Sequence, residues 1–239
     1  MTVRKAVSFV AQLRERIKAY DDRDILIIPP FTALWPLKDS VHAAGFYLGA
    51  QNCHWEPEGA YTGEISPLML KDVGCEFVLV GHSERRHLFG ESDETVGKKI
   101  RACFQYSLTP ILCIGEKLSE RESGLTFDVV KRQLSFAIQN LTDVQVSQLI
   151  IAYEPVWAIG TGKTASPGQA QEVHSLIRKF LSETFNENVA NQVRILYGGS
   201  VKPENVDELM AQIDIDGTLV GGASLKVESF ARIVNYQSL

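Results

Sequence analysis

The chain has 239 residues, of which 45% are hydrophobic, enough to bury the core of one large domain or two small ones. Its 24 Lys and Arg against 29 Asp and Glu give a formal net charge of −5, which disfavours a globally basic nucleic-acid-binding protein. Prolines interrupt the most apolar window, 25–37, which is shorter than the roughly 20 apolar residues of a membrane span. We therefore expect a soluble globular protein that binds neither nucleic acid nor membranes.

Four cysteines lie at positions 53, 75, 103 and 113, without the Cys-x-x-Cys spacing of many metal sites and redox motifs. Three of them have apolar neighbours, as reduced core thiols of cytoplasmic proteins do. The cysteines therefore indicate a cytoplasmic location, and they imply neither a zinc site nor a disulfide framework.

The first 18 residues predict a helix whose apolar side chains face the core, with Thr2 as its N-cap. Several basic residues in this segment would also fit a transit peptide, but Glu15 is atypical of one. We favour the core helix.

Seven short apolar runs follow, alternating with amphipathic segments, and they predict seven strands: Ile25–Pro30, Phe46–Gln51, Phe77–Val80, Pro110–Ile114, Leu149–Glu154, Val193–Tyr197 and Thr218–Val220. Runs that are apolar throughout are typical of parallel strands covered by helices. Four signals mark helix starts: Ser66-Pro67, Ser92-Asp93, Ser166-Pro167, and Pro203 before Glu204–Ala211.

This alternation predicts one α/β domain over residues 1–239, because no linker or change in composition divides the chain. An open doubly wound sheet and a closed (β/α)8 barrel both fit the pattern, and the length favours the barrel. The first predicted element is a helix, so a closed eight-stranded barrel would lack its first strand. We expect the resulting gap to be bridged by its neighbouring strands or left as a slot.

Polar residues that follow strands are the candidates for chemistry, because barrel active sites lie at the carboxyl ends of the strands. Ser83 can cap the helix after the third predicted strand, and His82 then lies at its N-terminus, where the helix dipole disfavours a charged imidazole. A neutral His82 can donate a hydrogen bond to a substrate carbonyl. The alternative is a histidine that is merely packed there.

A second candidate is Glu154, which ends an apolar strand and precedes a long apolar segment with two glycines. This arrangement predicts a carboxylate under a hinged lid that excludes water when it closes. The lid residues are Pro155, Val156, Trp157, Ala158, Ile159, Gly160, Thr161, Gly162, Lys163 and Thr164. The alternative is an ordinary surface loop with a solvated Glu154.

Paired glycines follow the last two predicted strands, as Gly198-Gly199-Ser200 and Gly221-Gly222. Glycines let backbone N–H groups approach an anion closely, and Ser200 adds a hydroxyl donor. Barrels commonly bind phosphate at the loops after their last two strands. A single Gly-Gly pair is usually only a turn, but two such pairs favour a phosphate site.

Together these segments resemble the triosephosphate isomerase family over the whole chain. The motifs that carry the resemblance are Gly81-His-Ser-Glu-Arg-Arg86, Ala152-Tyr-Glu-Pro-Val-Trp-Ala-Ile-Gly-Thr-Gly-Lys163, Tyr197-Gly-Gly-Ser200, Gly221-Gly222, Pro29–Thr32, Gly49–Asn52, Gly59–Glu64 and Cys113–Glu116. The resemblance implies interconversion of dihydroxyacetone phosphate and glyceraldehyde 3-phosphate in glycolysis and gluconeogenesis, with no metal and no organic cofactor.

The resemblance also implies roles for individual residues. Glu154 would be the base, and His82 the neutral electrophile that polarises the carbonyl. Glu84 would lie behind His82 near the floor of the site. The phosphate would be held by Gly160, Ser200, Gly221 and Gly222.

The loop Cys53–Ser66, with Tyr61 and Thr62, would reach into a second subunit, so a homodimer is implied. The alternative is a monomer with an exposed loop.

The chain departs from the family pattern at its first strand, which ends in Gly-Asn-Trp-Lys-Met and places its Asn and Lys in the active site. Met1 aligns just beyond that stretch, so this chain is expected to be weakly active or inactive. Our preferred interpretation is that Met1 is an internal methionine of a longer enzyme. The alternatives are a catalytically silent barrel that serves binding or assembly, and an enzyme for another sugar phosphate.

Overall fold

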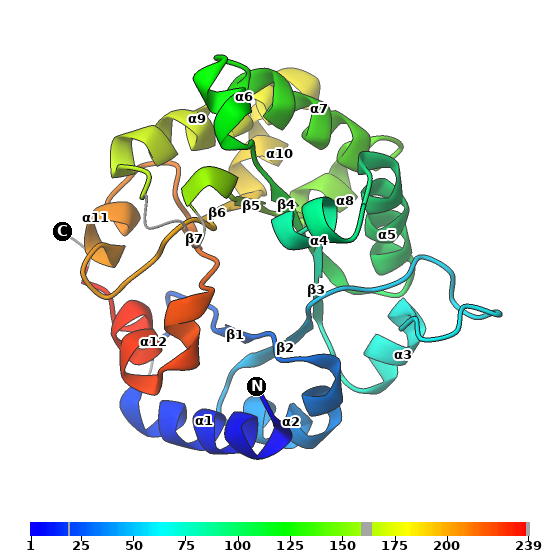
Figure 1. Ribbon diagram of the computed structural model, residues 1–239, viewed down its shortest axis with the longest axis vertical. Coiled ribbons are helices and arrows are strands. Elements are labelled where there is room, and N and C mark those ends of the chain that lie inside the picture. The colour runs from blue at the N-terminus through cyan, green and yellow to red at the C-terminus, as the bar shows by residue number, and fades with distance from the viewer. Residues whose placement is uncertain (19, 159–163, 238–239) are drawn as a thin grey trace.

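The computed structural model describes residues 1–18, 20–158 and 164–237, in which seven parallel strands form one curved sheet, ordered β1 to β7 and surrounded by helices (Figure 1). The strands are β1 (Leu26–Ile27), β2 (Tyr47–Ala50), β3 (Phe77–Val80), β4 (Thr109–Ile114), β5 (Ile150–Tyr153), β6 (Arg194–Tyr197) and β7 (Gly217–Thr218). The helices are α1 (Val3–Arg16), α2 (Phe31–Ala43), α3 (Pro67–Asp72), α4 (Ser83–Leu88), α5 (Asp93–Gln105), α6 (Leu118–Glu122), α7 (Thr126–Ile138), α8 (Asp143–Ser147), α9 (Pro167–Thr184), α10 (Glu187–Gln192), α11 (Val206–Met210) and α12 (Val227–Val234). Two 3-10 turns are η1 (Val156–Ala158) and η2 (Gly222–Leu225).

The predicted alternation of strands and helices is confirmed, since each of the seven apolar runs overlaps one strand. Ser66, Ser92 and Ser166 cap their helices as predicted, each accepting a hydrogen bond from a backbone N–H in the first turn. Thr2 occupies the N-cap position of α1, but its side chain makes no capping hydrogen bond.

The predicted start of a helix at Pro203 is wrong, because α11 begins only at Val206. The residues before it form a turn, in which Lys202 donates its backbone N–H to Oδ1 of Asn205 at 2.8 Å. The proline therefore belongs to this turn.

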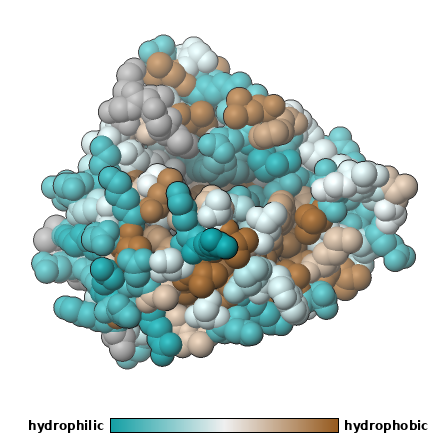
Figure 2. All heavy atoms as spheres, turned by 60° about the horizontal axis from the view of Figure 1, so that its bottom comes forward, coloured by the Kyte–Doolittle hydropathy of each residue, from teal (hydrophilic) through white to brown (hydrophobic). Residues whose placement is uncertain are grey.

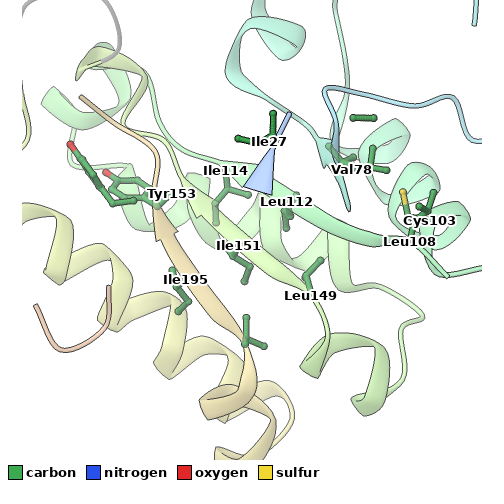
Figure 3. Packing of buried hydrophobic residues seen from close by; sticks show 14 of the residues in the cluster. Ile27, Val78, Cys103, Leu108, Leu112, Ile114, Leu149, Ile151, Tyr153 and Ile195 are labelled. Carbon is green, nitrogen blue, oxygen red and sulfur yellow. The ribbon is translucent and has the colours of Figure 1, made fainter. Parts of the chain in front are cut away.

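The strands separate two apolar layers. Side chains such as Leu112, Ile114, Ile151 and Ile195 belong to the large cluster between sheet and helices, and Figure 3 shows them along neighbouring strands. The residues between them in sequence point to the inside of the curved sheet, where Ile111 and its neighbours form a smaller cluster. Alternating side chains thus fill both faces of the sheet, as parallel strands require.

The residues that the structure describes form seven parallel strands in barrel order, and the sheet that they form does not close. β1 pairs with β2 and β7 with β6, and β1 and β7 do not pair with each other. All four residues of β5 are buried, whereas none of residues 216–220 at the β7 edge is. The sheet therefore leaves one gap, which we call the β1–β7 slot.

Helix α1 packs between α2 and α12, so it lies on the outside of this slot (Figure 1). The ring of Phe9 on α1 lies 6.2 Å from that of Phe230 on α12. With the molecule turned so that the bottom of Figure 1 comes forward, apolar side chains lie among hydrophilic ones around a hollow (Figure 2). Among the described residues, no helix has the length and apolarity to cross a membrane.

Candidate active site

One cavity of about 1490 Å³ brings together the candidate residues that follow β3, β5, β6 and β7. Its lining includes His82, Glu84, Glu154, Ser200, Gly221 and Gly222. Because all strands run in the same direction, the segments after them meet at one end of the sheet. Sequence positions far apart are thus joined as predicted, except Gly160, which lies outside the described residues.

Glu154 follows β5 directly and its side chain is 3% exposed. Its Oε1 lies 3.0 Å from Nε2 of His82, and its Oε2 accepts a hydrogen bond of 3.0 Å from the backbone N–H of Ser83. The carboxylate therefore spans from β5 to the start of α4, with both oxygens engaged.

His82 is itself the N-cap of α4, and the prediction that Ser83 caps this helix is wrong. The Nδ1 of His82 accepts a hydrogen bond of 3.3 Å from the backbone N–H of Glu84. Since Nδ1 is an acceptor here, the ring proton of a neutral imidazole lies on Nε2, which faces Glu154.

The pKa of His82 is raised, whereas the helix dipole alone would lower it. Burial lowers this pKa, but the hydrogen bond and the charge of Glu154, together with the charge of Glu84, outweigh burial and raise it above its ordinary value. The contact with Glu154 thus acts on this pKa in the direction opposite to the helix dipole.

Glu84 does not lie at the floor of the site, contrary to expectation. Its side chain is 69% exposed, with Oε2 3.9 Å from Nδ1 of His82. It occupies the first turn of α4, where a carboxylate is stabilised by the helix dipole without being buried.

Two glycines allow the backbone to pass close to Glu154. A Cβ added to Gly198 would lie 2.9 Å from Cγ of Glu154, and one added to Gly115 would lie 1.7 Å from its carbonyl oxygen. A larger residue at Gly198 would push on the side chain of Glu154, and one at Gly115 would push on its backbone. Gly198, the first glycine of the predicted phosphate loop, thus also leaves the space that the side chain of Glu154 occupies.

The segments after β6 and β7 form two turns beside the cavity. The carbonyl of Ser200 accepts a hydrogen bond of 2.9 Å from Nδ2 of Asn205, and the carbonyl of Gly221 accepts one of 2.9 Å from the N–H of Ser224. Apart from their chain neighbours, the described residues place no atom within 4 Å of the position that a Cβ would take on Gly221 or Gly222. This open space leaves room for a ligand beside their backbone.

Only the two ends of the predicted lid are described, namely Pro155, Val156, Trp157 and Ala158 at one end and Thr164 at the other. The predicted lid residues Ile159, Gly160, Thr161, Gly162 and Lys163 lie outside the described residues.

A fully buried carboxylate, Glu116, holds the first end of this segment. Its Oε1 accepts a hydrogen bond of 2.8 Å from Nε1 of Trp157, and its Oε2 accepts one of 3.1 Å from the hydroxyl of Tyr153. We assigned no role to Glu116 from the sequence. The sequence feature that could have pointed to Glu116 as a site residue is its position just after β4, which ends at Ile114.

Tyr61 and Thr62 lie in the loop between β2 and α3, which projects from the body of the molecule (Figure 1). The ring of Tyr61 lies 4.5 Å from that of His54, which lies 4.1 Å from that of Trp55. These residues do not line the cavity. The loop is therefore stiffened by stacked rings and remains separate from the site within one chain.

The described ranges contain no group of three or more His, Cys, Asp and Glu side chains arranged to hold a metal ion.

Comparison with known proteins identifies the family of this chain. The model of the family described as "Triosephosphate isomerase" matches residues 1–237. The triosephosphate isomerase of Carboxydothermus hydrogenoformans is 54% identical over 96% of this chain and 92% of its own length. That of Geobacter metallireducens is 53% identical, over 98% and 93% respectively. The chain belongs to the triosephosphate isomerase family.

Proposed function

We propose that this enzyme interconverts dihydroxyacetone phosphate and D-glyceraldehyde 3-phosphate by proton transfer through an enediolate, as a step of glycolysis and gluconeogenesis. The observation that carries the proposal is the contact of 3.0 Å between Nε2 of His82 and Oε1 of Glu154 in the cavity. A base and a proton donor on opposite sides of a carbonyl compound are what this reaction requires.

In the proposed reaction, substrate enters between the two side chains and replaces their mutual hydrogen bond. Glu154 takes a proton from the carbon next to the carbonyl, and the electron pair of that C–H bond forms the enediolate double bond while the carbonyl electrons move to oxygen. Nε2–H of His82 donates to that oxygen, since Nδ1 is held as an acceptor by the N–H of Glu84. His82 gives its Nε2 proton to that oxygen and takes up the hydroxyl proton of the neighbouring carbon, so the C=O double bond re-forms at that neighbouring carbon. Return of the proton from Glu154 to the former carbonyl carbon completes the isomer.

We assign phosphate binding to Ser200, Gly221, Gly222 and Gly160. The open space beside Gly221 and Gly222 supports this assignment. Residues 155–164 would close over the substrate, because an enediolate phosphate that is exposed to water can lose its phosphate before it is protonated. The contact of Trp157 with Glu116 supports a fixed hinge at the start of this segment.

We further propose a cytoplasmic homodimer in which the loop Cys53–Ser66 meets the second subunit. The side chain of Tyr61 is exposed at the projecting loop, which supports an interface there. All four cysteines are free thiols, which supports a reducing compartment.

We propose that the sheet is an eight-position barrel with one position unfilled between β1 and β7, and that this chain turns over slowly. Among the described residues, neither a lysine nor an arginine forms an ion pair with Glu154, whose partner is His82, and we propose that turnover is slow because the developing oxyanion has no cation held beside it. A cation 4 Å away is worth roughly 1 to 4 kcal/mol, and 1.36 kcal/mol changes a rate tenfold.

The test is a coupled assay that follows each direction of the reaction with the purified chain, its Glu154→Asp variant and the exposed control Glu122→Asp. We expect slow turnover that falls at least tenfold in Glu154→Asp and is unchanged in the control. Turnover that does not depend on Glu154, or none in any of the three, would contradict the proposal and favour a silent binding or assembly module.

A further inference from the structure

Two of the four cysteines, Cys53 and Cys103, are in contact although 50 residues separate them in the sequence. Their Sγ atoms lie 3.7 Å apart, and both side chains are buried. Cys53 begins the loop Cys53–Ser66, whereas Cys103 lies on α5, where Figure 3 shows it among apolar residues of the core. Of the four cysteines, all within the described residues, these two alone contact each other. To form a disulfide, the two sulfur atoms would have to approach from 3.7 Å to about 2.05 Å.

The start of this loop is already held against α5 by polar contacts. Oδ1 of Asn52 accepts a hydrogen bond of 2.8 Å from Nζ of Lys99, which also forms a buried ion pair with Glu91. Lys99 and Cys103 are four residues apart on α5, so they lie on the same face of the helix. Asn52 and Cys53 therefore meet one face of α5, and a disulfide between Cys53 and Cys103 would add a covalent bond to this attachment.

The closed protein protects both thiols from rapid oxidation. The hydrogen bond with Cys53, together with burial, raises the pKa of the Cys103 thiol well above its ordinary value, so that thiol stays protonated. A reagent can reach the pair only through a local opening, and such openings occur where few contacts hold the chain. Residues 58–64 of the loop are all exposed, so the loop is the side that we expect to open.

We propose that Cys53 and Cys103 are a site of reversible oxidation, at which hydrogen peroxide converts the two thiols to a disulfide that ties the loop Cys53–Ser66 to α5. In the first step the thiolate of Cys53 attacks one oxygen of the peroxide, the O–O bond breaks, and the sulfur becomes a sulfenic acid. In the second step the sulfur of Cys103 attacks that of Cys53, loses its proton and displaces hydroxide, which leaves as water. Two thiols and one hydrogen peroxide thus give one disulfide and two molecules of water. This chemistry is separate from the isomerase reaction, so either proposal can fail without the other.

The first test treats the full chain with hydrogen peroxide and then alkylates the remaining thiols in denaturant, which prevents disulfide exchange. We expect two of the four free thiols to be lost and dithiothreitol to restore them. Chymotrypsin can cleave after Phe104 and Tyr106, which separates Cys103 from Cys113. Mass spectrometry of the unreduced digest should then find Cys53 joined to Cys103. A disulfide between any other pair, or oxidation to sulfur acids without a disulfide, would overturn the proposal.

Two variants test the order of the steps. Cys103→Ala removes the thiol that would attack the sulfenic acid, and Cys75→Ala is the matched control, because Cys75 is also buried but contacts no other cysteine. Dimedone, which traps sulfenic acids, should label Cys53 at least tenfold more in Cys103→Ala than in the unaltered chain. Cys75→Ala should form the disulfide as the unaltered chain does. Equal labelling of Cys53 in the two variants would contradict the proposed second step.

The effect of the disulfide on the loop is measured by hydrogen exchange and by urea unfolding. In the oxidised chain we expect slower exchange in segments 53–57 and 99–105 and unchanged exchange in the distant strand 150–153. The urea midpoint should rise by about 0.5–1 M, because the bond closes a long loop in the unfolded chain. Peroxide should cause neither change in Cys103→Ala. A disulfide that forms but leaves both exchange and midpoint unaltered would refute the claim that it ties the loop to α5.

Discussion

The imidazole of His82 contacts the carboxylate of Glu154, with Nε2 3.0 Å from Oε1. The proposed electrophile and the proposed base thus bind each other at the place where the substrate would bind between them. The raised pKa of His82 depends on this contact. Substrate must separate the two groups before either can act on it.

The first prediction is that Glu154→Gln lowers the pKa of His82, because its hydrogen bond and charge raise that pKa against the effect of burial. A two-dimensional NMR titration of the imidazole measures the change. Glu84→Gln is the control and should lower the pKa less, since its carboxylate is exposed and 3.9 Å away. An unchanged pKa in Glu154→Gln would contradict the account.

The contact between His82 and Glu154 also makes the stability of the fold depend on pH in a definite direction. Because the folded pKa is raised, the contribution of the pair is fully present below the ordinary pKa of histidine and is lost as pH rises through the folded value. The difference in unfolding free energy between the chain and its Glu154→Gln variant should therefore shrink with rising pH.

The second prediction concerns His174, whose pKa burial lowers to about 4. The unfolded chain takes up this proton near pH 6.5 and the folded chain only near 4, so stability falls as pH drops through this window, by up to about 3 kcal/mol. Urea unfolding at a series of pH values should show a shallower fall in His174→Gln. His42→Gln is the matched control at a half-exposed site, and an equal slope in all three proteins would refute the prediction.

The third prediction is that Gly198→Ala lowers kcat by about 10- to 100-fold. The added Cβ would lie 2.9 Å from Cγ of Glu154 and would displace the carboxylate, and small misplacements of a reacting group are costly. Gly168→Ala is the control, because within the described ranges its Cβ would meet no atom within 4 Å outside its own helix and chain neighbours. Steady-state kinetics measure both, and equal kcat values would argue against the placement of Glu154.

The fourth prediction is that Glu116→Gln destabilises the fold by about 1–3 kcal/mol, because an amide cannot accept hydrogen bonds on both sides from Trp157 and Tyr153. Equilibrium urea unfolding measures this loss. Glu122→Gln on the exposed face of α6 should change stability little. Equal midpoints for the two variants would count against an anchoring role of Glu116.

The sequence predicted the strands well because each is an apolar run too short for a helix and bounded by turns. β3 matches its predicted bounds, and the ends of the other strands differ from the predicted ones by at most three residues, the largest difference being at the end of β1. The start of α11 was mispredicted since Pro203 fits a helix start and a turn equally well, and only the bond between Lys202 and Asn205 distinguishes them.

The meeting of His82 and Glu154 in one cavity was predictable, because each follows a strand and parallel strands end at the same edge of the sheet. The site was not predictable where contacts decide. Glu84 is exposed although its position suggested the floor, and Glu116 is buried because donors from two other segments meet it. Such environments depend on distant parts of the chain that no local pattern contains.

The most direct test of the central claim is deuterium uptake, followed by proton NMR, when dihydroxyacetone phosphate is converted in D2O by the chain and by its Glu154→Gln variant. If Glu154 takes the proton from the first carbon, exchanges it with D2O and returns a deuteron to the second carbon, the chain should form glyceraldehyde 3-phosphate with deuterium at C2, and the variant should do so at least a hundredfold more slowly. Equal rates of deuterated product from both proteins would show that another group moves the proton and would contradict the account.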